Sequence, residues 1–252
     1  RRLAVLLVLL GAGCQAASSS TTPPGSAPAA TPVAAVPTPR DPMMPLAHQS
    51  EAVAAFTQML DRRLQAARSS DAAGVEEIDA AVRARFEKPM GVMITDMSGM
   101  TELTKSRGII GILALIREMQ HITVPVVNKH GGTWVKMEAD DLFVTHTSAK
   151  GLYAAGREML DAVKKHNEDT KDDSLKMGMG LGFGKVLDLG DDIWGDAVNT
   201  ASKLGEDTAE PGEILMTEDF HAALLAEGEK APECKPVEGA ARKAKFAYYS
   251  CR

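Results

Sequence analysis

The sequence predicts an α+β domain preceded by an extended N-terminal segment. From about residue 88 to the end, strand-like apolar runs alternate with segments of helical periodicity. Hydrophobic residues make up 44% of the chain and charged residues 25%, the balance of a soluble globular protein. Residues 15–45 are mainly Ala, Ser, Thr and Pro, a composition that cannot bury a core.

The first 14 residues resemble an export signal. Arg1 and Arg2 precede eight apolar residues, and small residues then lead to Cys14. A helix needs about 20 apolar residues to span a bilayer. The pattern is similar to a bacterial lipoprotein signal with Cys14 as the lipidated residue, although Gly11 stands where that motif usually has Leu; an ordinary signal peptide is the alternative. Residues 15–45 would then be a semi-extended tether to a membrane.

Residues 46–87 predict a helical lead-in. Apolar residues at helical spacing form one stripe from Val53 to Leu64 and another from Val75 to Phe86, with a break at Ser69-Ser70-Asp71. Such stripes can join two copies of a chain, but more often they pack on their own domain.

Charge and cysteine content exclude two classes of function. The net charge of −6 gives the chain no electrostatic footprint for nucleic acid. The three cysteines match no metal-ligand spacing. If Cys14 is lipidated, Cys234 and Cys251 remain near the C-terminus, and the segments beside them could be antiparallel neighbours. We predict a Cys234–Cys251 disulfide if the domain is exported, and two free thiols in a cytosolic protein.

The predicted domain covers residues 88–252. A buried strand from Val92 to Thr95 ends at Asp96, and a long helix from Ile109 to Val124 has apolar residues on more than one face, so it should be well buried. Glycines at every second position from Gly178 to Gly184 indicate a close approach to that strand by a ligand or another element. The other expected elements are helices at 148–166, 196–205 and 218–226 and strands at 175–186, 213–216 and 246–249.

A charged hairpin stands out at Gly132–Asp141. A strand-like start is followed by a lysine, a glutamate and two aspartates, just before an apolar run. Charges beside buried strands are costly unless they are paired or bind a metal. A solvated hairpin tip is the alternative.

Two of these carboxylates could act together. Asp96 ends a buried strand, and Asp140 lies in the hairpin. Carboxylates at the ends of neighbouring strands can share one or two Mg²⁺ ions, with substrate phosphates and water completing the shell. A third polar segment contains Asp192, followed by Asn199 and Lys203, which lie four apart on one helix face.

These three segments resemble the catalytic domain of class III adenylate and guanylate cyclases over about residues 88–250. The family's first metal motif, Asp-(Ile)-x-Gly-(Phe)-Thr, appears as Asp96–Thr101. Its hairpin motif, Lys-x-x-Gly-Asp, appears as Lys136–Asp140, and its third motif runs from Asp192 to Lys203. The order and spacing of all three agree.

The resemblance implies a role for each matching residue. Asp96 and Asp140 would bind two Mg²⁺ or Mn²⁺ ions, assisted by the backbone carbonyl of Met97. The ions would polarise the α-phosphate of the nucleotide and lower the pKa of the ribose 3′-hydroxyl, which attacks and expels pyrophosphate. Lys136 and Asp192 would read the base, and since guanylate cyclases typically carry Glu and Cys at these positions, the pair favours ATP.

Two further residues have implied roles, and the sequence departs from the family's motifs at several positions. Asn199 would orient the ribose, and Lys203 would stabilise negative charge on the phosphates in place of the family's usual Arg. Ala139 replaces Gly beside the metal site, and Met100 replaces Phe. We therefore expect an adenylate cyclase of lowered activity. The remaining acidic residues of these segments are expected to serve structure or solvation: Asp141, Glu138, Asp191 and Asp196.

The resemblance also implies a fold and an assembly. In this family the base readers and the metal ligands of one site come from different chains, so a homodimer is implied, with a ferredoxin-like antiparallel sheet covered by helices. An exported, membrane-anchored lipoprotein meets little ATP. An inactive nucleotide- or ligand-binding module is therefore the alternative function, and a cytoplasmic protein without a true signal is the alternative location.

Overall fold

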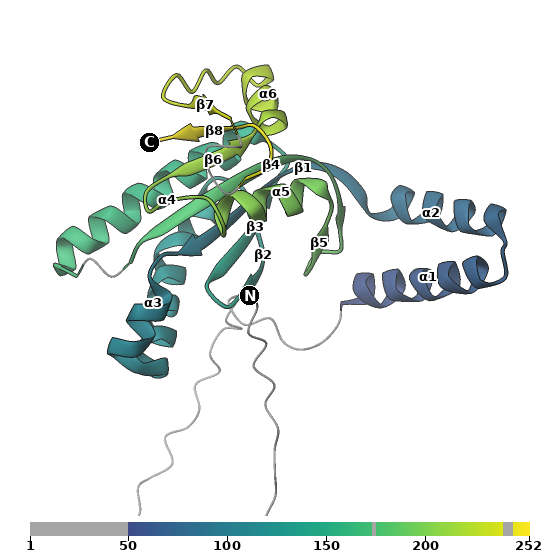
Figure 1. Cartoon of the computed structure of the whole chain (residues 1–252), viewed down its shortest axis with the longest axis horizontal. Helices are drawn as coiled ribbons and strands as arrows, with labels where there is room; N and C mark the ends of the chain where they lie inside the picture. The colour runs from purple at the N-terminus through teal and green to yellow at the C-terminus, as the bar shows by residue number, and fades with distance from the viewer. Residues whose placement is uncertain (1–49, 173–174, 239–243) are drawn as a thin grey trace, which may run out of the picture. The chain divides into compact units, whose positions relative to one another are not determined.

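A computed structural model describes residues 50–172, 175–238 and 244–252 (Figure 1). The export signal, the lipidated Cys14 and the tether expected at the N-terminus lie outside the described residues. The elements, in order, are α1 (Glu51–Arg68), α2 (Ala72–Phe86), β1 (Glu87–Met97), α3 (Met100–Lys129), β2 (Thr133–Glu138), β3 (Asp141–His146), α4 (Ala149–Thr170), β4 (Met177–Asp188), β5 (Ile193–Trp194), α5 (Asp196–Gly205), β6 (Ile214–Thr217), α6 (Glu218–Ala226), β7 (Lys235–Val237) and β8 (Tyr248–Cys251).

The strands form one sheet with helices packed on both faces, which confirms the α+β fold. Its order is β2-β3-β1-β4-β6-β8-β7, and β5 pairs with β4 outside this path. The sheet is antiparallel except for the pair β4–β6, which is parallel. The predicted antiparallel sheet thus contains one parallel pair.

Strand β1 lies in the middle of the sheet and faces both helical layers. Met93 packs in the core cluster that contains residues of α3 and α4. Val92 and Ile94 pack instead with Ala197 and Ala201 of α5. Because successive side chains of a strand point to opposite faces, α5 covers one face and α3 and α4 the other.

The glycines of β4 allow α5 to lie directly on the strand. A Cβ at Gly180 would lie 2.1 Å from the carbonyl oxygen of Ala201, and one at Gly182 would lie 2.4 Å from that of Ala197. The close approach predicted for this strand is thus made by another element of the chain.

Helix α3 is longer and less buried than the sequence predicts. It kinks at Gly108, where φ is 70°, and eight of its residues are buried in the core. Ile109, Ile110 and Leu113 are 64%, 81% and 57% exposed. By length and composition α3 is also apolar enough to cross a membrane, a property that core helices of soluble proteins share. The apolar residues of α3 lie on more than one face of the helix, and the rest of the same chain covers only one of these faces.

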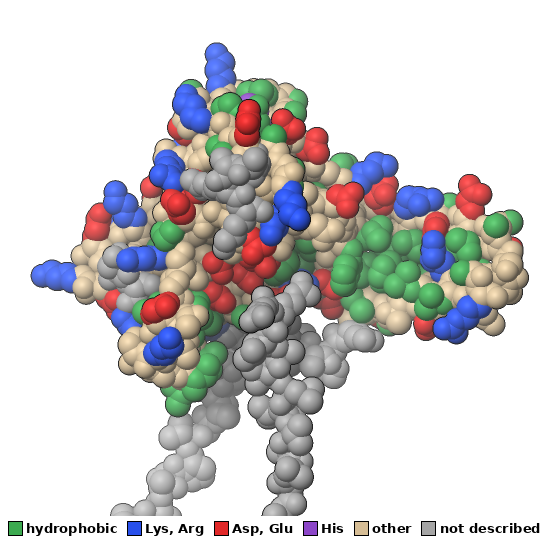
Figure 2. Space-filling model, viewed as in Figure 1, with side chains coloured by type: hydrophobic (Ala, Val, Ile, Leu, Met, Phe, Trp, Pro, Cys, Tyr) green, Lys and Arg blue, Asp and Glu red, His purple; other side chains and the backbone are tan. Residues whose placement is uncertain are grey.

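Helices α1 and α2 pack on each other and on β4. Phe56 and Met59 of α1 join a cluster with Phe86 and with Leu189, just after β4. Figure 2 shows hydrophobic side chains gathered over both helices. Ser50 caps α1, and its Oγ also donates to Asp191 at 2.7 Å. The N-terminus of α1 is therefore fastened to the loop between β4 and β5.

A disulfide joins Cys234 to Cys251, with an S–S distance of 2.02 Å. It links the residue before β7 to the last residue of β8, and these two strands are antiparallel neighbours. The pairing matches the one expected from the cysteine content. An oxidising location for the protein stays a prediction.

We predict that Cys251→Ser lowers the free energy of unfolding by about 3 kcal/mol. The disulfide closes the loop between Cys234 and Cys251 in the unfolded chain and so lowers the conformational entropy of that chain. Urea denaturation of the oxidised protein measures the loss. The reductant dithiothreitol should destabilise the parent and leave the Cys234→Ser/Cys251→Ser variant unchanged. Equal midpoints for the parent with and without reductant would contradict the prediction.

Candidate functional site

Three carboxylates meet where β1 ends and the β2–β3 hairpin turns. The register of β1 and β3 pairs Thr95 with Leu142, which carries Asp96 and Asp141 to the same end of the strands. Asp140 is the turn residue next to Asp141. Within the described residues, Asp141 Oδ1 is buried without a hydrogen-bond partner. Figure 2 shows acidic side chains gathered on the face that carries this hairpin.

The surroundings of these three carboxyl groups oppose their ionisation and raise their pKa values. Burial, then the charges of Asp140 and Glu206, raise the pKa of Asp96 to about 7. Burial, then Glu206 and Asp140, raise the pKa of Asp141 to about 8. Burial also raises the pKa of Asp140, opposed by a backbone hydrogen bond from Met97. No ion pair within the described residues offsets these charges, so the cluster favours a bound cation.

The chemistry of these donors fits Mg²⁺ or Mn²⁺. Carboxylate and carbonyl oxygens are the ligands that such hard ions prefer. Among the described residues, no three acidic, His or Cys side chains lie close enough to enclose a metal unaided. If Asp96, Asp140 and the Met97 carbonyl bind a metal ion, a substrate or water must therefore supply the rest of its shell.

Asp141 is the residue that sequence reasoning missed here. The sequence assigns Asp141 to structure or solvation and not to the site. Asp141 begins β3 directly after the turn, and the charge of Asp96 is among the causes that raise the pKa of its carboxyl group. The two consecutive aspartates, Asp140 and Asp141, were the feature of the sequence that could have indicated its role.

Ala139 occupies a turn position that favours glycine. Its φ is 54°, in the left-handed region where a Cβ is strained. The glycine of the hairpin motif stands at this position. The departure therefore has a cost in the backbone, in addition to any effect on the neighbouring Asp140.

Ala139→Gly should stabilise the protein by about 1 kcal/mol, because glycine adopts this conformation without steric cost. Ala54→Gly, at an exposed position inside α1, is the matched control and should destabilise by about 1 kcal/mol. Urea denaturation of both variants measures whether each substitution raises or lowers the free energy of unfolding. A loss of stability in Ala139→Gly would show that the turn does not strain Ala139.

The two residues predicted to read a base form an ion pair. Lys136 Nζ on β2 lies 2.7 Å from Asp192 Oδ1 in the β4–β5 loop. It also pairs with Glu138 and lies 4.8 Å from the ring centre of Phe143. Burial lowers the pKa of Lys136, but hydrogen bonds to Asp192 and Glu138 outweigh it, and the pKa is raised. Lys136 is therefore charged at neutral pH.

Helix α5 carries the remaining predicted residues. Asn199 is exposed, and Lys203 Nζ pairs with Asp207 Oδ2 at 2.6 Å. The end of the helix lies beside β1, where Glu206 and Asp207 act on the charge of Asp96. Within the described part of the chain, no hydrogen bond or ion pair connects the Lys136–Asp192 pair with the carboxylate cluster. Glu138 lies between the two groups, because it pairs with Lys136 and its charge also raises the pKa of Asp141.

The sequence also matches the model of a known protein family. A family model described as the adenylate and guanylate cyclase catalytic domain matches residues 82–249. The chain belongs to this family. The cyclase domain contains all the predicted site residues: Asp96, Met97, Lys136, Asp140, Asp192, Asn199 and Lys203.

The chain spans about a third or less of the length of the curated relatives that it matches. The chain is 26% identical over 162 residues to the serine/threonine-protein kinase pkn2 of Myxococcus xanthus, a match of 64% of this chain and 19% of that protein. It is 30% identical over 134 residues to the uncharacterized protein Rv2212 of Mycobacterium tuberculosis, 53% of this chain and 34% of that one. A putative adenylate cyclase 3 of Rhizobium meliloti is 25% identical over 108 residues, 42% of this chain and 18% of the relative.

Solved structures show the same cyclase fold. The adenylate/guanylate cyclase/hydrolase from Silicibacter pomeroyi superposes with a TM-score of 0.56 at 21% identity, covering 65% of this chain and 95% of that one. The adenylyl cyclase CyaB from P. aeruginosa gives a TM-score of 0.51 at 22% identity, covering 66% and 95%. Adenylyl and guanylyl cyclases both occur among these structures, so the likeness shows the cyclase fold and leaves the base to be argued from the site.

Proposed function

We propose that this domain is an adenylate cyclase, which converts ATP to cyclic AMP and pyrophosphate at the interface of a homodimer with two Mg²⁺ or Mn²⁺ ions. The observation that carries the proposal is the Lys136–Asp192 ion pair, with an Nζ–Oδ1 distance of 2.7 Å. It provides one donor and one acceptor held side by side.

The pair is complementary to adenine. The Lys136 ammonium donates to the unprotonated N1, and the Asp192 carboxylate accepts from the 6-amino group. Guanine presents a proton at N1 and an oxygen at position 6, the reverse arrangement. Because a site that hydrogen-bonds the base leaves its polar groups unpaired with the wrong base, discrimination of roughly 10⁴ is attainable.

Within the described residues no hydrogen bond or ion pair joins Lys136 or Asp192 directly to the carboxylate cluster, which supports a site shared between two chains. The carboxylates of one copy would face the base-reading pair and Asn199 of the other. The exposed apolar residues of α3 supply a surface of the kind that monomers rarely leave uncovered: Ile109, Ile110 and Leu113. In a twofold dimer each chain contributes to both sites.

Each group of residues then has one task. Asp96, Asp140 and the Met97 carbonyl hold the metal ions, which supply the Lewis acid that polarises the α-phosphate and lowers the pKa of the 3′-hydroxyl. Asn199 orients the ribose. Lys203 stabilises the charge of the phosphates, and Asp207 competes for its ammonium group.

Mixing two inactive variants tests the shared site. Asp96→Asn lacks a metal ligand and Lys136→Ala lacks a base reader, so each homodimer should be inactive. A mixed dimer keeps one site with all its residues, so mixing the two should restore part of the activity. The control is a mixture of Asp96→Asn with Asp140→Asn, which spoils both sites in every dimer. No recovery in mixed dimers confirmed by native mass spectrometry would contradict a shared site.

Lys203→Arg should raise kcat with ATP and Mn²⁺ by about tenfold, equal to about 1.4 kcal/mol. The guanidinium fork binds two phosphate oxygens at once and can still meet Asp207, whereas an ammonium group acts as a point charge. Asp207→Asn, which releases Lys203 without changing it, is the companion variant and should give a smaller rise. A fall in kcat for Lys203→Arg would contradict this role.

A further inference from the structure

The β4–β5 loop carries Asp192, one of the two residues proposed to read the base. Strand β5 consists only of Ile193 and Trp194, and in the described part of the chain it pairs with β4 alone. A two-stranded hairpin is at best marginally stable in water on its own. The position of Asp192 therefore depends on the contacts that this loop makes with the rest of the chain.

Hydrogen bonds inside the loop set the direction of the Asp192 carboxylate. The Leu189 N–H donates to the carbonyl oxygen of Asp192 at 2.9 Å, and the Ile193 N–H donates to Asp192 Oδ1 at 2.9 Å. The same oxygen lies 2.7 Å from Lys136 Nζ. The carboxylate is thus held by the backbone of the loop as well as by Lys136. A shift of the loop would move it away from a base.

Ser50, the residue before α1, fastens this loop. Its Oγ donates to Asp191 Oδ1 at 2.7 Å, and its backbone N–H donates to Asp191 Oδ2 at 3.2 Å. The same Oγ accepts from the Val53 N–H at 3.2 Å, so one hydroxyl group joins the helix to the loop. Hydrogen bonds to an ionised carboxylate are stronger than neutral ones, and the N-terminal end of a helix attracts negative charge. Both effects favour the link.

Apolar contacts support the same loop. Leu189 is 3% exposed and packs in one cluster with Phe86 of α2 and with Phe56 and Met59 of α1. The rings of Phe56 and Phe86 meet edge to face, with their centres 5.7 Å apart. Both helices of the lead-in therefore contribute to the position of the loop.

We propose that Ser50 and Asp191 are positioning residues that hold Asp192 where it reads adenine, so that the helical lead-in forms part of the nucleotide site. This inference rests on the proposed function. Because a loop that is ordered before binding needs no further ordering when the ligand arrives, the link raises the affinity for the nucleotide. Within the described residues, neither Ser50 nor Asp191 bonds to the carboxylate cluster or to Lys203, so the link acts on binding rather than on the chemical step.

Three variants separate this link from the capping of α1. In Ser50→Asp a carboxylate still caps the helix, since Asp and Ser are similarly good N-caps, but it repels Asp191. Asp191→Ala removes the acceptor and leaves the cap formed by Ser50 in place. Ser50→Asp combined with Asp191→Asn gives the loop an amide that donates to the introduced carboxylate. This double variant should therefore recover most of the parental behaviour.

Hydrogen–deuterium exchange of the 252-residue chain measures how firmly the loop is held, and it needs neither nucleotide nor metal. Ser50→Asp and Asp191→Ala should each raise the exchange rates of the Leu189 and Ile193 amides by about tenfold, because the loop opens locally more often. Asp71→Ala is the matched control, since Asp71 caps α2 as Ser50 caps α1 and, within the described residues, forms no hydrogen bond with the loop. It should leave these amides as in the parent.

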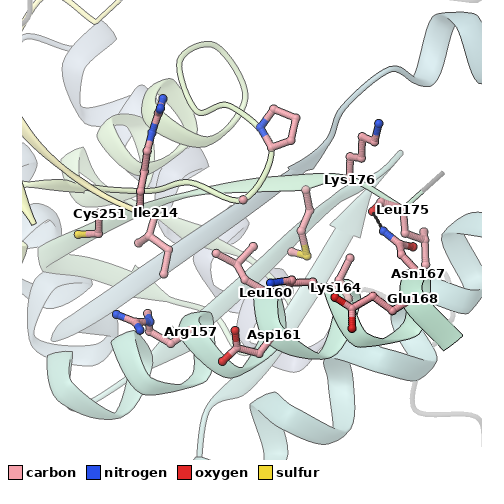
Figure 3. Close-up of a pocket in the computed structure, with 15 residues that line it drawn as sticks. Arg157, Leu160, Asp161, Lys164, Asn167, Glu168, Leu175, Lys176, Ile214 and Cys251 are labelled. Carbon is pink, nitrogen blue, oxygen red and sulfur yellow. Dashed lines mark hydrogen bonds between the residues drawn. The ribbon is translucent and has the colours of Figure 1, made fainter. Parts of the chain in front are cut away.

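Isothermal titration calorimetry with Mn²⁺ and 3′-deoxy-ATP, which lacks the attacking hydroxyl, measures nucleotide binding without turnover. Ser50→Asp and Asp191→Ala should raise the Kd by about tenfold, and Asp71→Ala should bind as the parent does. The nucleotide carries no fluorophore, because an apolar label could enter the cavity of about 750 Å³ beside α4 (Figure 3). With ATP, KM should rise by a similar factor while kcat changes by less than about threefold.

The results that would overturn this inference differ from those that bear on the proposed function. If the parent binds 3′-deoxy-ATP and Ser50→Asp binds it equally well, the link does not position Asp192, whatever the exchange rates are. Equal effects of Ser50→Asp and Asp71→Ala, or no recovery in the double variant, would also overturn the inference. No binding of 3′-deoxy-ATP by the folded parent would contradict the proposed function, and the inference would fall with it.

Discussion

Asp96→Asn will abolish cyclase activity and will also stabilise the metal-free protein at pH 8. Activity is lost because the amide is a poor ligand for Mg²⁺ or Mn²⁺, and a loss of at least about 10³-fold is expected when a metal ligand is removed from a catalytic site. Stability rises because the substitution removes one negative charge from a half-buried group of carboxylates.

The pH dependence of this gain follows from the direction of the pKa shift. The pKa of Asp96 is about 7 in the folded protein, against an ordinary value of 3.8, so its ionisation favours the unfolded chain. Stability contributed by the protonated form is present below pH 3.8 and is lost as the pH rises toward 7. The advantage of Asp96→Asn should therefore be small at pH 4 and complete at pH 8.

Thermal unfolding in EDTA and in Mn²⁺ measures both effects. Mn²⁺ should raise the melting temperature of the parent more at pH 8 than at pH 6, because the carboxylates must lose their protons to bind the ion. It should not stabilise Asp96→Asn to the same degree. Asp169→Asn, at an exposed position on α4, is the control and should change neither property. If metal-free Asp96→Asn were less stable than the parent at pH 8, this would contradict the claim that the uncompensated charges of the carboxylate cluster destabilise the metal-free protein.

Gly180→Ala should destabilise the protein by roughly 4 kcal/mol or more, which places it among the most damaging single substitutions. The new Cβ would lie 2.1 Å from Ala201 O and 2.4 Å from Gly205 N, and both are backbone atoms that cannot rotate away. Helix α5 would have to leave the sheet, and with it Asn199 and Lys203 would leave the site.

Gly184→Ala in the same strand provides the matched control. A Cβ there would meet only Ala197 Cβ at 3.5 Å, an ordinary contact. Urea denaturation should therefore give nearly parental stability for Gly184→Ala and a low midpoint or an unfolded protein for Gly180→Ala. Similar midpoints for the two variants would contradict the close packing of α5 on β4.

The fold could be predicted because local pattern and motif spacing act together, whereas the roles of the site residues stay predictions. The apolar run before Asp96 can only be a buried strand, and the glycine series in β4 records a close neighbour. Lys136 and Asp192 are distant in sequence, yet the resemblance to the family placed them together, and the structure joins them in an ion pair.

Other features depend on tertiary register and on surfaces that local pattern does not specify. Asp141 joins Asp96 because β1 and β3 pair in one particular register. The exposed Ile109, Ile110 and Leu113 of α3 are as apolar as its buried residues, so periodicity could not tell them apart. The link between Ser50 and Asp191 joins residues whose spacing carries no motif. In each case a contact between distant segments decides the outcome.

The most direct test is the synthesis of cyclic nucleotide by the purified 252-residue chain. It is supplied with Mn²⁺ and either ATP or GTP, beside an Asp96→Ala control. The adenylate cyclase proposal predicts cyclic AMP from ATP, much less cyclic GMP from GTP, and no product from the variant. No product from either nucleotide, in a protein shown to be folded and dimeric, would contradict it and would indicate a nucleotide- or ligand-binding module.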